Sequence, residues 1–274
     1  AIAYLWKESG SKCVNLKQTH EIIKIIRIIC NSLNSPAIIV TETNLPEKEN
    51  ISYFGKRDEA HWIYNFSLPP LLVHSLLFED SKKITSWSKK LPQNKIGNSY
   101  LNFIASHDGI GMRPVEGLLN KRSINKMFKR LKKNGGEFSF RKIKGKSKKV
   151  YETNITLFNA FHKTDTDPKG TFHYARYICA HAIMISFEGV PAVYFNSMFG
   201  TANDMNKYII SNNKRDLNRY KWGSERLVKL LNNKSSKQHL FYEEITNLLN
   251  IKQRNKAFHP NAHRQTLNLG PKIF

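Results

Sequence analysis

Cysteine is scarce in this sequence of 274 residues, and none of its three cysteines belongs to a C-x-x-C pair. A disulfide framework needs cysteines that can pair, and a zinc knuckle needs closely spaced ones. Cys13, Cys30 and Cys179 are scattered and odd in number, which argues against both kinds of scaffold. Free thiols are typical of a reducing compartment, so we expect a cytoplasmic protein.

Long apolar runs are also missing. The longest, Phe66–Phe78, is broken by Pro69 and Pro70 and interrupted by His74, so it cannot serve as a membrane span. The sequence shows no secretory signal peptide, and it opens without a Met on a strand-like apolar run. We therefore expect no membrane partner, and we expect a truncated reading frame.

Acidic residues are few, with 21 Asp and Glu against 44 Lys and Arg, and the formal net charge is +23. Such a charge is compatible with nucleic-acid binding. The excess is mostly Lys, however, and it accompanies abundant Asn and Ile, whose codons are also richest in A and T. In the most basic stretch, Lys121–Lys133 is predicted as an amphipathic helix and Arg141–Lys149 as a solvated loop. We expect no nucleic-acid partner, and a basic nucleic-acid-binding protein is kept as the distant alternative.

Short apolar runs alternate with amphipathic stretches, which is typical of βα units around a parallel sheet. The predicted strands are Ile2–Leu5, Ala37–Thr43, Tyr100–Ser106 and Ala192–Asn196. The predicted helices are His20–Cys30, Leu71–Phe78, Ile124–Leu131, Ala175–Phe187 and Phe241–Arg254. Residues 261–274 then alternate like a strand, so a second domain is expected to start near Phe258.

Two predicted strands end in charged residues. Glu42 closes the run Ala-Ile-Ile-Val-Thr-Glu, and His107 and Asp108 close Leu-Asn-Phe-Ile-Ala-Ser-His-Asp. Either carboxylate alone could simply cap a helix or pair with an Arg. In a (β/α)8 barrel, however, the active site lies at the carboxyl ends of the strands. Finding carboxylates at two such ends favours a catalytic role.

Around these residues the sequence resembles the sucrose phosphorylase subfamily of glycoside hydrolase family 13, in the α-amylase superfamily. The matching segments are AIAYLWKE (1–8), QTHE (18–21), TETN (41–44), ENISYFG (49–55), LPPLL (68–72), ASHDGIG (105–111), NDM (203–205) and RDLNR (215–219). The resemblance implies an α/β fold: the C-terminal half of a (β/α)8 TIM barrel in residues 1–257, from the end of strand four to strand eight. It also implies the start of a C-terminal β domain in residues 258–274.

The family uses three carboxylates and a covalent glucosyl-enzyme. By the resemblance, Glu42 corresponds to the general acid/base and Asp108 to the carboxylate that stabilises the transition state. Ala1 looks like the Ala of the family motif Arg-x-Asp-Ala, so the nucleophilic Asp is expected immediately upstream.

The resemblance also implies residues that bind the substrate. His107 is similar to the family His that hydrogen-bonds the glucosyl ring, and Arg219 is similar to an Arg on the acceptor side. Tyr4, Asn44 and Glu152 match positions that line the same cleft. For Arg219 the alternative is a surface Arg of a basic protein.

The implied reaction is reversible phosphorolysis of a small α-glucoside by double displacement, with a sugar and inorganic phosphate as substrates and no metal or organic cofactor. Because Thr-Glu-Thr-Asn around Glu42 looks more like glucosylglycerate phosphorylases, glycerate and fructose 6-phosphate join fructose as candidate acceptors. A hydrolase or a transglucosylase such as an amylosucrase is the alternative within the superfamily. Since a barrel closes only when all its strands pair, residues 1–274 alone are expected to be inactive and poorly folded.

Overall fold

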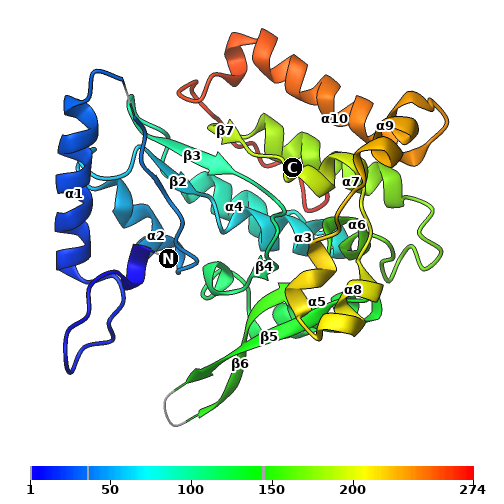
Figure 1. The fold of residues 1–274 in the computed structure, drawn as a ribbon, viewed down its shortest axis with the longest axis horizontal. Coiled ribbons are helices and arrows are strands. Elements are labelled where there is room, and N and C mark those ends of the chain that lie inside the picture. The colour runs from blue at the N-terminus through cyan, green and yellow to red at the C-terminus, as the bar shows by residue number, and fades with distance from the viewer. Residues whose placement is uncertain (1, 36, 144–145) are drawn as a thin grey trace.

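A four-stranded parallel sheet lies at the centre of the computed structural model, which describes residues 2–35, 37–143 and 146–274 (Figure 1). Its strands pair in the order β1-β2-β3-β7, with bounds Val40–Thr41, Trp62–Tyr64, Ser99–Asn102 and Val190–Pro191. Every pair is parallel, so each connection must cross over the sheet, and each crossover contains helix. This is the predicted βα alternation.

The structure confirms the predicted helices and extends most of them. The α-helices are α1 (Lys17–Ser32), α2 (Glu47–Ile51), α3 (Leu68–Phe78), α4 (Lys82–Lys90), α5 (Lys121–Lys133), α6 (Leu157–Ala160), α7 (His173–Ser186), α8 (Met205–Ser211), α9 (Ser224–Asn232) and α10 (Lys237–Arg254). Short 3-10 helices are η1 (Ile2–Tyr4), η2 (Ser52–Phe54), η3 (Arg113–Val115), η4 (Phe195–Phe199), η5 (Lys214–Asn218) and η6 (Lys256–Phe258).

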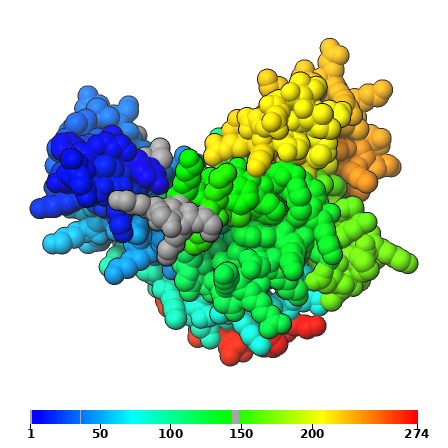
Figure 2. Space-filling view, turned by 90° about the horizontal axis from the view of Figure 1, so that it is seen from below, coloured from blue at the N-terminus to red at the C-terminus, as the bar shows by residue number. Residues whose placement is uncertain are grey.

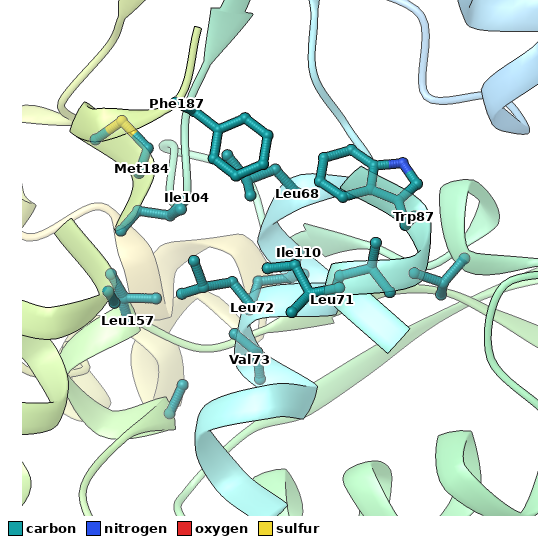
Figure 3. Packing of buried hydrophobic residues seen from close by; sticks show 14 of the residues in the cluster. Leu68, Leu71, Leu72, Val73, Trp87, Ile104, Ile110, Leu157, Met184 and Phe187 are labelled. Carbon is teal, nitrogen blue, oxygen red and sulfur yellow. The ribbon is translucent and has the colours of Figure 1, made fainter. Parts of the chain in front are cut away.

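Helix α3 forms much of the core. Pro69 and Pro70 occupy its first turn, where the missing amide protons cost no intrahelical hydrogen bond. The helix is apolar all round, and Leu68, Leu71 and Leu72 are fully buried (Figure 3). Truncating one of these leucines to Ala would cost about 2–5 kcal/mol of unfolding free energy. The apolar run that is too short for a membrane span is therefore a core helix.

A second, antiparallel sheet projects from the loop that follows β3. It consists of β4 (Ile110–Gly111), β5 (Glu137–Ile143) and β6 (Lys146–Asn154), in the order β4-β6-β5. In Figure 2 this green part of the chain lies between the blue N-terminal segment and the yellow segment near residue 210. The loop predicted for Arg141–Lys149 is thus wrong for the described part of this range, because residues 141–143 and 146–149 belong to two paired strands whose cross-strand pairing the single sequence did not reveal. Residues 144 and 145 lie outside the described residues.

The predicted strands need three corrections. In place of the predicted strand Ile2–Leu5, Ile2–Tyr4 forms η1 and the Leu5 amide donates to the Ile2 carbonyl, while Ala1 lies outside the described residues. Strand Ala192–Asn196 is displaced: β7 ends at Pro191, and the chain then turns into η4. Strands Ala37–Thr43 and Tyr100–Ser106 are shorter than predicted. Strand β2 was missed because its short aromatic run leads straight into the Pro-Pro start of α3.

Residues 259–274 form no strand in the structure. They run along the amino-terminal side of the sheet, where Ser81 donates from its amide to the Pro271 carbonyl (2.7 Å) and Asn94 donates to the Pro260 carbonyl (2.8 Å). The alternating Leu267, Leu269 and Ile273 are all exposed. The alternation that predicted a strand therefore has no buried face, whereas the domain boundary near Phe258 stays a prediction.

Candidate active site

One cavity of about 290 Å³ opens at the carboxyl edge of the parallel sheet. Glu42 follows β1 directly, Tyr64 ends β2, and Asp108 lies in the loop after β3. Glu152, on strand β6, supplies a further wall. Segments distant in sequence meet here because parallel strands deliver their carboxyl ends to the same edge.

Five of the seven predicted site residues line this cavity, namely Tyr4, Glu42, Asn44, Asp108 and Glu152. The other two, His107 and Arg219, adjoin it through Asp108. Nε2 of His107 lies 3.5 Å from Oδ1 of Asp108, and Nη2 of Arg219 donates to the same oxygen at 2.8 Å. The structure thus brings the whole predicted set together, and the role of each residue remains a prediction.

The Asp108 loop is held by the segment Arg-Asp-Leu-Asn-Arg. Nδ2 of Asn218 donates to the Asp108 carbonyl at 2.9 Å, and Nε of Arg219 donates to the His107 carbonyl at 3.1 Å. Backbone and side chain of Asp108 are therefore fixed by the same short segment, while the carboxylate stays 26% exposed. A carboxylate with this partial exposure can still meet a ligand.

Two glycines let the loop after β3 approach its neighbours. A Cβ on Gly109 would lie 2.4 Å from the Thr153 carbonyl oxygen, and one on Gly111 would lie 2.6 Å from Oδ1 of Asn44. Any larger residue would push β6 or Asn44 away from the cavity. The motif Ser-His-Asp-Gly-Ile-Gly therefore combines a carboxylate with the close packing that positions it.

Aromatic side chains form the apolar wall of the cavity. Phe103 packs edge-on against both Tyr64 and Phe66, with ring centroids 5.3 and 5.2 Å apart. Burial raises the pKa of the Tyr64 phenol, and the negative charge of Glu42 adds to that shift. An apolar wall beside paired carboxylates suits a sugar ring, which presents both C–H groups and hydroxyls.

Arg215 is the functional candidate that sequence reasoning missed. Its guanidinium contacts Glu152 and Asp108 at once. A signal was available, because Arg215 and Arg219 stand four residues apart in the same matched segment, yet only the second was selected. Among the described residues, no group of three or more His, Cys, Asp or Glu side chains could hold a metal ion.

The parallel sheet with helical crossovers defines the class of the molecule: it is about half of a (β/α)8 barrel, with a cleft where such barrels carry their active sites. The fold matches the crystal structure of sucrose 6F-phosphate phosphorylase from Thermoanaerobacter thermosaccharolyticum with a TM-score of 0.78 at 20% identity, covering 94% of this chain and 49% of that one. None of the helices in the described ranges combines the length and hydrophobicity that a bilayer crossing requires.

Curated relatives identify the family. The chain is 36% identical to the glucosylglycerate phosphorylase of Escherichia coli (strain K12), covering 95% of this chain and 46% of the relative. It is 34% identical to that of Spirochaeta thermophila (100% and 46%) and 26% identical to the sucrose phosphorylase of Agrobacterium vitis (80% and 43%). No protein-family model matches it. The chain belongs to the sucrose phosphorylase subfamily of glycoside hydrolase family 13, and it spans about half the length of the curated relatives it matches.

Proposed function

We propose that this chain carries the acid/base side of a retaining α-glucoside phosphorylase, which transfers a glucosyl group between a small acceptor and inorganic phosphate and so forms α-glucose 1-phosphate. The observation that supports this most directly is that Glu42 and Asp108, delivered by different strands, line one cavity at the carboxyl edge of the sheet. The phosphorylase relatives support the same reaction class.

The proposed chemistry divides between the two carboxylates. Glu42, which is exposed in the cavity, donates a proton to the departing acceptor oxygen and later removes one from the incoming phosphate. Asp108 binds ring hydroxyls and stabilises the positive charge that develops at the anomeric carbon. His107 is proposed to bind the same ring. The aromatic wall keeps water from the glucosyl-enzyme, which favours phosphate over water as the attacking group.

Double displacement also needs a nucleophile, roughly 5 Å from the acid/base. Glu152, the remaining carboxylate among the described cavity-lining residues, is buried and bound by Arg215 and Asn154, so it cannot attack a sugar. We therefore assign the nucleophile to a carboxylate outside the described residues. Residues 1–274 would then not turn over by themselves. The outer edges of β1 and β7, which pair with no described strand, would also leave them poorly folded.

We infer that the acceptor is of glycerate type. Three of the curated relatives, 34–36% identical, are glucosylglycerate phosphorylases. A guanidinium group matches carboxylate and phosphate oxygens, and Arg219, which adjoins this cavity through Asp108, has no hydrogen bond from its Nη1 to any described residue. Tyr4 and Asn44 are proposed to complete the acceptor side. We place the enzyme in the cytoplasm, since its three cysteines are free thiols, which persist in a reducing compartment.

The test uses the full-length protein, which is the product of the complete reading frame that contains these residues. It is incubated with α-glucose 1-phosphate and either glycerate, fructose, fructose 6-phosphate or no acceptor, and phosphate release is measured. Release that requires glycerate supports the proposal. Release without any acceptor would indicate a hydrolase, glucan formation would indicate a transglucosylase, and no release with any acceptor would overturn the proposal.

A matched pair of variants links the activity to the cavity. Glu42→Gln removes the acid/base group and is expected to lower turnover roughly 10²–10⁴-fold. Glu225→Gln makes the same chemical change at an exposed position of α9 and should leave turnover unchanged. Equal activity in the two variants would remove Glu42 from the mechanism.

A further inference from the structure

One guanidinium in the cleft contacts carboxylates from two different parts of the fold. Nη2 of Arg215 lies 2.9 Å from Oε2 of Glu152, and its Nε lies 3.2 Å from Oε1 of the same carboxylate. Its Nη1 lies 3.1 Å from Oδ2 of Asp108. Arg215 belongs to η5, Glu152 to β6 and Asp108 to the loop after β3, so this side chain joins three elements.

Glu152 anchors this arrangement. Its side chain is only 4% exposed, and it also accepts a hydrogen bond from Asn154. Two parallel N–H···O contacts to one carboxylate fix the plane of a guanidinium as well as its place. The third nitrogen, Nη1, therefore points at Asp108 in a direction that Glu152 determines.

Asp108 is held at both oxygens by different arginines. Arg219 takes Oδ1 at 2.8 Å, and Arg215 takes Oδ2 at 3.1 Å. The two arginines are not equivalent, however. Arg215 uses Nε, Nη1 and Nη2, whereas Nη1 of Arg219 has no hydrogen bond to any described residue and remains available to a ligand.

We propose that Arg215 is a positioning residue: anchored by the buried Glu152, it sets the orientation of the Asp108 carboxylate toward the glucosyl ring. The proposal rests on the proposed function, in which Asp108 stabilises the transition state of both half-reactions. Loss of Arg215 therefore lowers the rate of both half-reactions by the same factor and leaves the KM for the acceptor near its original value.

A simple deletion does not separate positioning from folding. Arg215→Ala leaves the buried Glu152 carboxylate without its counter-charge, which is strongly destabilising. The decisive variant is therefore the double change Arg215→Ala with Glu152→Gln, since an amide in place of the carboxylate removes the unpaired charge. Arg122→Ala, at an exposed position of α5, is the control for loss of an arginine.

In the full-length protein, the double variant is expected to melt close to the wild type while kcat falls roughly 10²-fold in both half-reactions. A double variant with wild-type kcat would show that Arg215 serves only as the counter-ion of Glu152, and it would overturn the proposal. So would a loss confined to the acceptor KM, because Arg215 would then be an acceptor-binding residue.

A binding measurement separates this proposal from the function on which it rests. D-glucose is titrated into the wild type and the double variant by NMR. If the wild type transfers glucose to no acceptor, the proposed function fails. The positioning role of Arg215 is then tested only by the affinities of the two proteins for D-glucose. At least a tenfold weaker affinity in the double variant supports the positioning role, equal affinities overturn it, and a wild type that neither transfers nor binds glucose overturns both proposals.

Discussion

Two arginine–carboxylate pairs lie at opposite edges of the parallel sheet, and their surroundings differ. At the amino-terminal edge, Nε of Arg264 lies 3.2 Å from Oε1 of Glu188, which is separated from β7 by Gly189. Its other nitrogens donate to the Ser88 and Leu91 carbonyls. At the carboxyl edge, Arg215 is held just as closely by Glu152, but it also reaches Asp108, which faces the cavity.

The two arginines differ in the acceptors that their remaining N–H groups contact. Among the described residues, the N–H groups of Arg264 bind only Glu188 and groups that belong to the fold, such as the Ser88 and Leu91 carbonyls. Burial raises the pKa of Glu188, although the positive charge of Arg264 opposes that shift. Arg215 has one donor on a carboxylate that a ligand can reach. An arginine–carboxylate pair therefore joins the segment after α10 to the barrel at one edge, and a second pair orients Asp108 at the other. This division matches the faces of such a barrel, of which one serves stability and the other carries the active site.

Among the residues of these two pairs and their partners, the largest effect on catalysis is expected from Asp108→Asn in the full-length protein. The amide loses the charge that stabilises the transition state, so turnover should fall roughly 10²–10³-fold with little change in melting temperature. Asp165→Asn, which alters an exposed carboxylate paired with Arg130, is the control and should leave turnover intact. Near-normal turnover of Asp108→Asn would show that Asp108, at the carboxyl edge of the sheet, is not needed for catalysis.

The opposite edge is tested by Arg264→Ala. Removing one partner of a buried ion pair leaves Glu188 uncompensated, which should lower the free energy of unfolding by about 3–5 kcal/mol. Turnover per folded molecule should not change, because Arg264 lies far from the cleft in the fold. Denaturant unfolding measures the first quantity and initial rates the second. A kinetic defect in a fully folded sample would contradict the division between the two edges.

The two arginines of the cleft can also be separated. Arg219→Ala is expected to slow the half-reaction with phosphate or acceptor more than the formation of the glucosyl-enzyme, because Nη1 of Arg219 is available to the incoming group. Pre-steady-state kinetics of each half-reaction measure the two losses. Equal losses would place Arg219 beside Arg215 as a residue that only positions Asp108.

The smallest expected effect concerns a buried group away from both edges. His181 on α7 is fully buried, and burial lowers its pKa to about 4. Between about pH 6.5 and 4 the unfolded chain therefore binds a proton that the folded protein does not, so stability falls as the pH drops through this window. At pH 5.5 the loss is about 1 kcal/mol relative to neutral pH.

His181→Gln should remove this contribution. Unfolding of the wild type and the variant at pH 7.5 and 5.5 measures it as a difference, so carboxylates common to both proteins cancel. The same pH dependence in both would show that the ring is accessible to protons in the folded state.

Helix positions could be read from the sequence because their signals are local. The spacing of Ile22, Ile25, Ile26 and Ile29 predicted α1, and it did so correctly even though Ile25 and Ile29 remain exposed in the structure. Strand ends were less predictable, because a strand is defined by its partner. The run Ala192–Asn196 is apolar enough for a strand, yet the chain turns into η4 before it can pair that far.

The sequence by itself determined the alternation of strands and helices, together with the carboxylates and the histidine that close two of the strands. These features depend on residues next to one another, and Glu42, His107 and Asp108 could be chosen from them. Only the tertiary structure decided that Arg215 joins Glu152 to Asp108. That contact needs three segments, from β6, η5 and the loop after β3, whose meeting point depends on how the barrel strands and the hairpin pack, and no local pattern records it.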